Sequence, residues 1–225
     1  MKKSNLHSSK KLHKIKFIIL EHVNNNLKDY LFLSLFFIVG IIFGVVFINK
    51  LDGIKHEQSS QYINGIITSL KHDYKIDNLN LLKTSIIENI KLTIILWFAG
   101  STVIGMPFIY GIICYKGFCI GYTSSTIIGA LGIQKGCVFL ATSLLFQNII
   151  FIPCMLMLGV SGLKMYRSII KDRRRENIKI ELYRHTVFCL FSLCGLIFSS
   201  FIETYISSNL FTHIINFLLL DNGVK

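Results

Sequence analysis

The chain has 225 residues, of which 52% are hydrophobic and 16% are charged, and its formal net charge is +12. Soluble domains usually carry about 25% charged residues, and here the deficit is concentrated in long apolar runs. An all-α integral membrane protein is therefore favoured over a loop-rich soluble fold. A nucleic-acid-binding surface is not expected, because most aromatic side chains lie inside the apolar runs rather than among the basic residues.

The first apolar run covers residues 30–49 and follows a lysine-rich polar lead at residues 1–29. About 20 apolar residues in a helix cross the hydrocarbon core of a bilayer. No small-residue cleavage pattern follows the run, so it is expected to stay in the protein as a membrane anchor. Gly40 and Gly44 form a GxxxG pair within it, which permits another helix to approach closely. Both glycines are candidate helix-packing residues.

An amphipathic segment follows at residues 50–91. Its charges are mixed, and Ile63, Ile66, Ile67 and Leu70 recur at the spacing of one helix face. The segment is too polar to cross a membrane and too regular to be a disordered linker. Ile66 and Ile67 are therefore candidate partner contacts.

Four more transmembrane helices are predicted, which makes residues 1–225 one polytopic membrane domain with five spans. A short loop is expected at Lys116 and a basic loop at residues 164–185. A shorter apolar stretch near the C-terminus is expected to lie at the membrane interface. The further spans are predicted at residues 92–114, 118–133, 137–163 and 186–206. Their candidate packing or partner-contact residues are Gly105, Pro107, Gly117, Gly121 and Pro153, the last as the expected site of a helix kink.

The distribution of charge predicts the orientation in the membrane. With five spans, the lead, the Lys116 loop and the basic loop fall on one side and carry a net charge of +11, against +1 on the other. Because basic loops stay in the cytoplasm, the N-terminus is expected inside the cell, and the C-terminus and the amphipathic segment outside.

No catalytic, metal-binding or cofactor-binding residues are predicted. The seven histidines all fall outside the predicted spans, so neither a histidine metal site nor a Ser–His pair is expected within them. Gln147 and Asn148 are expected to hydrogen-bond to a neighbouring helix, with a ligand or transport site as the alternative. Glu203 is expected to reach the interface or to pair with another subunit, with a proton relay as the alternative.

The chain resembles the stage II sporulation protein M family of endospore-forming bacteria. The resemblance is carried by short motifs along nearly the whole chain: Leu96-Trp97, Val103-Ile104-Gly105-Met106-Pro107, Lys116-Gly117, Gly121-Tyr122-Thr123, Gln147-Asn148, Ile152-Pro153 and Glu203-Thr204-Tyr205-Ile206-Ser207. It also extends to the first span, from Tyr30 to Gly44. The segment at residues 50–91 is the least similar part.

The resemblance implies a non-enzymatic scaffold in the septal membrane of the mother cell. Such a protein would recruit the peptidoglycan-degrading pair, stage II sporulation proteins D and P, during engulfment. Membrane lipid is the other expected partner, and a homo-oligomer is left open. The alternative from a different class is a small-solute transporter or a permease subunit.

Overall fold

A computed structural model gives the arrangement of the chain, and it describes residues 23–50, 61, 78–171 and 175–207. These residues form helices and no strand, which confirms the all-α fold. The α-helices are α2 (Leu27–Lys50), α4 (Asn78–Ser101), α5 (Gly105–Leu131), α6 (Ile133–Lys171) and α7 (Arg175–Ile202), and α7 continues into a short π-helix, η1 (Glu203–Ser207).

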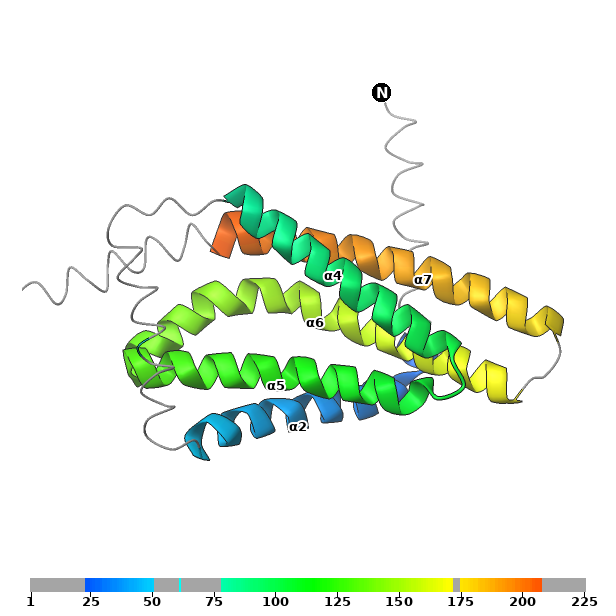
Figure 1. The fold of residues 1–225 in the computed structure, drawn as a ribbon, viewed down its shortest axis with the longest axis horizontal. Helices are drawn as coiled ribbons and strands as arrows, with labels where there is room; N and C mark the ends of the chain where they lie inside the picture. The colour runs from blue at the N-terminus through cyan, green and yellow to red at the C-terminus, as the bar shows by residue number, and fades with distance from the viewer. Residues whose placement is uncertain (1–22, 51–60, 62–77, 172–174, 208–225) are drawn as a thin grey trace, which may run out of the picture.

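The helices lie side by side as an elongated bundle around α6 (Figure 1). α4 and α7 run along one side of α6, while α5 and α2 lie along the other. α6 contacts every other described helix, and α2 makes its most extensive contact with α5. The core therefore forms around α6, from fully buried side chains of five helices. These include Leu33, Leu96, Ile109, Ile113, Met155, Leu158, Leu163 and Leu196.

The outside of the bundle carries many large apolar side chains. α2 carries large apolar side chains that are exposed, for example Phe32, Phe43 and Phe47. α4 and α7 also present such side chains, among them Ile95 and Phe198. A soluble monomer rarely exposes so much contiguous apolar surface. The fold is that of a protein associated with a membrane.

Three helical stretches are long and apolar enough to cross a membrane, within the part of the chain that the structure describes. They are Leu27–Lys50, Gln147–Ile170 and Ile178–Tyr205. Five membrane-crossing helices therefore stay a prediction. α4 carries Lys83, Glu88 and Lys91, which limits its apolar part to the residues after Lys91, about three turns of helix.

The helix boundaries correct three of the sequence-based expectations. The predicted span at residues 92–114 is divided, because α4 ends at Ser101 and α5 begins at Gly105. The loop expected at Lys116 is wrong, since Lys116 lies within α5, which is continuous to Leu131. The basic loop expected at residues 164–185 is mostly helix: α6 extends to Lys171 and α7 starts at Arg175.

The turn between α4 and α5 has a local cause. The backbone N–H and the hydroxyl of Thr102 both donate to the carbonyl of Ala99, at 3.3 and 3.1 Å, and close the end of α4. A Cβ on Gly105 would lie 1.5 Å from the same carbonyl oxygen. A residue with a side chain would clash there, so the turn into α5 requires glycine at this position. The candidate residue Gly105 thus serves the turn rather than a helix–helix contact.

Candidate functional site

The contact between α2 and α5 is made by glycines. A Cβ on Gly40 or Gly44 would lie 2.1 or 2.3 Å from a backbone oxygen of α5, and one on Gly117 or Gly121 would lie 2.2 Å from a backbone oxygen of α2. Two small-xxx-small pairs therefore face each other, and the two backbones touch. The structure brings these four predicted packing residues together.

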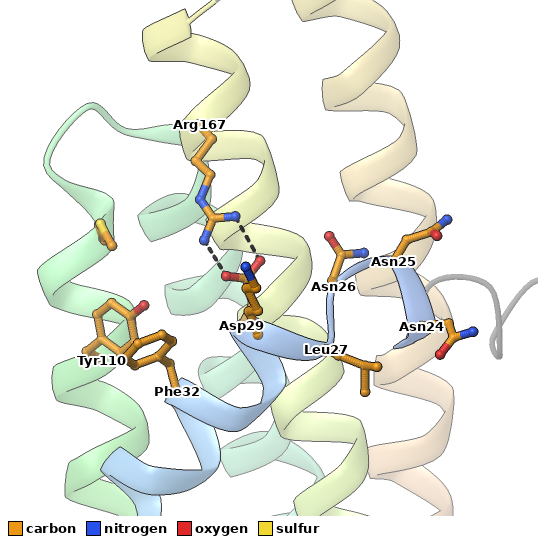
Figure 2. A pocket seen from close by; sticks show the side chains of 10 residues that line it. Asn24, Asn25, Asn26, Leu27, Asp29, Phe32, Tyr110 and Arg167 are labelled. Atoms are coloured by element: carbon orange, nitrogen blue, oxygen red, sulfur yellow. Dashed lines mark hydrogen bonds and ion pairs between the residues drawn. The ribbon is translucent and has the colours of Figure 1, made fainter.

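An ion pair joins the start of α2 to the last turns of α6 (Figure 2). Arg167 Nη1 donates to Asp29 Oδ2 at 2.9 Å, and Nη2 donates to Oδ1. Asp29 is buried, so the guanidinium satisfies a carboxylate that has little access to water. Both residues fall in polar segments outside the predicted spans, so hydropathy did not predict this contact.

A chain of polar side chains joins α4 to the end of α7. Asn89 Nδ2 donates to Ser200 Oγ at 2.7 Å, Ser200 Oγ lies 2.9 Å from Ser85 Oγ, and the Ser85 hydroxyl donates to Glu203 Oε2. Each hydroxyl has one proton to donate. All three contacts are satisfied if the Asn89 amide donates to Ser200, Ser200 donates to Ser85, and Ser85 donates to the Glu203 carboxylate. The partner of Glu203 is thus a residue of its own chain.

A buried histidine corrects the expectation that no Ser–His pair lies within the spans. His185 is 2% exposed, and its Nδ1 lies 2.9 Å from Ser161 Oγ on α6. A Cβ on Gly100 would lie 2.9 Å from His185 Nε2 and 2.6 Å from the Cα of Gly162. Gly100 on α4 therefore makes room for the imidazole and for the close approach of α6 at Gly162. The prediction failed because α7 begins at Arg175, eleven residues before the predicted span at residues 186–206.

The other predicted residues lie apart from these contacts. Gln147 and Asn148 are half-buried on α6, and the hydroxyl of Ser199 on α7 donates to the backbone carbonyl of Gln147 at 3.1 Å. Pro153 lies inside α6, and Pro107 is exposed on α5. Ile66 and Ile67 lie outside the described residues.

Among the residues placed by the structure, no three His, Cys, Asp or Glu side chains are grouped so that they could hold a metal ion. Several polar side chains of the bundle form interhelical contacts, including those given above.

Together these features define the class: an all-helical membrane protein whose helices are joined by glycine contacts and by buried polar pairs. Within that class the chain belongs to the stage II sporulation protein M family, whose profile matches residues 33–208. An uncharacterized protein of Methanocaldococcus jannaschii is 27% identical over 184 residues, which cover 80% of this chain and 93% of that protein. No solved structure matches the chain significantly.

Proposed function

We propose that the chain is a non-enzymatic scaffold of the sporulation septum that recruits and localises peptidoglycan-degrading enzymes for engulfment. The observation that carries this proposal is the family match over residues 33–208. The partners are stage II sporulation proteins D and P, and these partners supply the hydrolytic chemistry.

The interhelical contacts support a structural role for the polar residues. Asp29, Glu203 and His185 are the groups best suited to acid–base chemistry inside the bundle, and each contacts a side chain of another helix. Buried polar groups bonded in this way fix how helices pack. A scaffold requires such a fixed bundle, because its partners must meet the same surface each time.

The docking surface that we propose is the amphipathic stripe on the extracytoplasmic segment. Partners that degrade the cell wall act outside the cytoplasm, and the charge pattern predicts that residues 50–91 lie on that side. Ile66 and Ile67 form the centre of the stripe and would present an apolar face to a partner helix.

The test is recovery of partners from membranes of sporulating cells. An affinity-tagged chain should co-purify proteins D and P well above an unrelated multi-pass bait of equal abundance. Ile66→Glu combined with Ile67→Glu should reduce that recovery and impair engulfment, while the protein still inserts at normal levels. Recovery of both partners at the level of the unrelated bait would rule out the scaffold.

Leu79→Glu is the matched control variant. Leu79 lies at the start of α4, is 73% exposed, and is predicted on the same side of the membrane. The control should keep wild-type recovery, because a charge at an exposed site outside the stripe disturbs no contact with a partner. Equal losses in both variants would show a general effect of charge and would refute docking on the stripe.

A further inference from the structure

A cavity of about 790 Å³ lies at the end of the bundle where α2 begins. Its volume is within the roughly 300–1,000 Å³ that is typical of sites for small molecules. Three helices supply its walls, and the residues that precede α2 complete its lining. The lining residues are Asn24, Asn25, Asn26, Leu27, Lys28, Asp29, Phe32, Met106, Tyr110 and Arg167 (Figure 2 labels eight of them).

The cavity presents positive charge. The Asp29 side chain is 9% exposed, whereas the Arg167 side chain is 44% exposed. Two N–H groups of Arg167 bind Asp29, and the guanidinium has five, so donors remain for a ligand. Lys28 lines the cavity and is exposed. Because the Asp29 carboxylate is covered, the accessible charged groups of the cavity are those of Arg167 and Lys28. Both groups are cationic and suit a singly or doubly charged anion.

Neutral donors and an apolar wall narrow the class of ligand. Asn24 and Asn25 are exposed and add amide N–H groups that suit phosphate oxygens. Phe32, which is 56% exposed, belongs to the apolar outer face of α2 and lines the same cavity. A ligand that fits both parts is polar and anionic at one end and apolar beside it.

We propose that this cavity binds the phosphate group of an anionic phospholipid, with the glycerol and upper acyl chain against Phe32. The bundle end that carries it is the one where the charge pattern places the cytoplasmic leaflet. Basic residues near that leaflet attract anionic lipid. The site is independent of any docking surface on residues 50–91, and its test does not involve the wall-degrading partners.

The experiment uses the purified full chain in nanodiscs of phosphatidylcholine with increasing phosphatidylglycerol. Thermal unfolding and native mass spectrometry report protection and bound lipid. Inorganic phosphate added to phosphatidylcholine nanodiscs forms the second arm. Lipid is the source if phosphatidylglycerol raises the unfolding temperature and phosphate alone does not. If both protect equally, free phosphate is the ligand and the lipid assignment is wrong.

Two variants test the location. Lys28→Glu should weaken the apparent affinity for phosphatidylglycerol by about fivefold or more, because each basic residue near a membrane contributes about a fivefold factor. Asn25→Trp should reduce lipid binding by occupying the cavity without any change in charge. Lys50→Glu, at the other end of α2 and also exposed, should leave binding unchanged. Lipid binding that is equal in all three variants, or lost equally in all three, would overturn the proposal.

Discussion

A Cβ atom on Gly40 would lie 2.1 Å from the carbonyl oxygen of Cys114, well inside van der Waals contact. The obstacle is the backbone of α5, which cannot rotate away as a side chain can. The two helices would have to separate to admit even one methyl group.

Gly40→Ala should therefore destabilise the protein by about 1–3 kcal/mol or more, the usual cost of overpacking. Gly111→Ala is the matched control, because it is also a glycine within an α-helix and has nothing within 4 Å of its added Cβ. The control should be neutral or stabilising by up to about 1 kcal/mol. Unfolding in mixed micelles with increasing denaturing detergent measures both variants. Equal stability of the two would disprove the close contact of α2 with α5.

The sequence predicted the glycines at this contact but not what each of them does. Gly40 and Gly44 indicated a close approach, yet nothing in their spacing names α5 as the partner. Gly117, next to Lys116, is predicted at the start of a span, although it lies in the middle of α5. A glycine at a helix boundary and one that admits a neighbouring helix have the same local sequence. Only the position of the other helix separates the two cases.

The polar contacts were beyond sequence reasoning for a related reason. Asp29 and Arg167 are 138 residues apart, and each lies beside an apolar run rather than in its middle. His185 was placed outside its span because the preceding residues are charged. The structure shows α7 starting at Arg175, which carries His185 into the bundle beside Ser161. Helices that extend beyond their apolar runs bring such polar residues together, and hydropathy alone does not predict it.

Arg167→Gln should destabilise the bundle more than loss of an ordinary surface ion pair. The substitution leaves the buried Asp29 carboxylate without its cationic partner. Breaking a fully buried pair costs about 3–5 kcal/mol. Because the Arg167 side chain is partly exposed, we expect about 1–3 kcal/mol here, measured by the same unfolding assay.

The Asp29–Arg167 ion pair provides its own control, because its two charges can be removed together. Asp29→Asn combined with Arg167→Gln removes both charges and should be more stable than Arg167→Gln alone. Glu88→Gln breaks an exposed ion pair with Lys91 and should leave stability nearly unchanged. A double variant that is no better than the single one would argue against the pair as the source of the loss.

The corrected helix boundaries change how the topology should be tested. The start of α2, the α4–α5 turn and the end of α6 share one end of the bundle, since Asp29, Met106 and Arg167 line one cavity. A reporter inserted after Val103, in the turn, should therefore report the cytoplasm, and Lys116 is unsuitable because it is helical.

Reporters after His56, after Gly132 and at the C-terminus should report the outside, if the five helices cross in alternation. Without Lys116, which lies within α5, the charge difference is +10 against +1, and this difference carries the expectation. Neutralising Arg173, Arg174 and Arg175 together should lower the fraction of correctly inserted protein. A cytoplasmic C-terminus in a correctly inserted chain would contradict five spans.

The contact between Ser85 and Glu203 gives the sharpest test of the polar chain that joins α4 to η1. Ser85→Ala removes the hydroxyl that donates a hydrogen bond to Glu203, and Glu203→Gln removes the negative charge of the group that accepts it. Hydrogen bonds between membrane helices contribute about 0.6 kcal/mol on average and up to about 1.7. Because the acceptor here is charged, we expect the contribution of this hydrogen bond to lie near the upper end of that range. In a double-mutant cycle, the two substitutions should therefore show a coupling free energy of about 1–2 kcal/mol.

The control cycle pairs Ser85→Ala with Arg167→Gln. Arg167 lies near the C-terminal end of α6 and does not contact Ser85, so the effects of these two substitutions on stability should add. Additivity in both cycles would mean that Ser85 and Glu203 do not interact, and that Glu203 is available to another subunit after all.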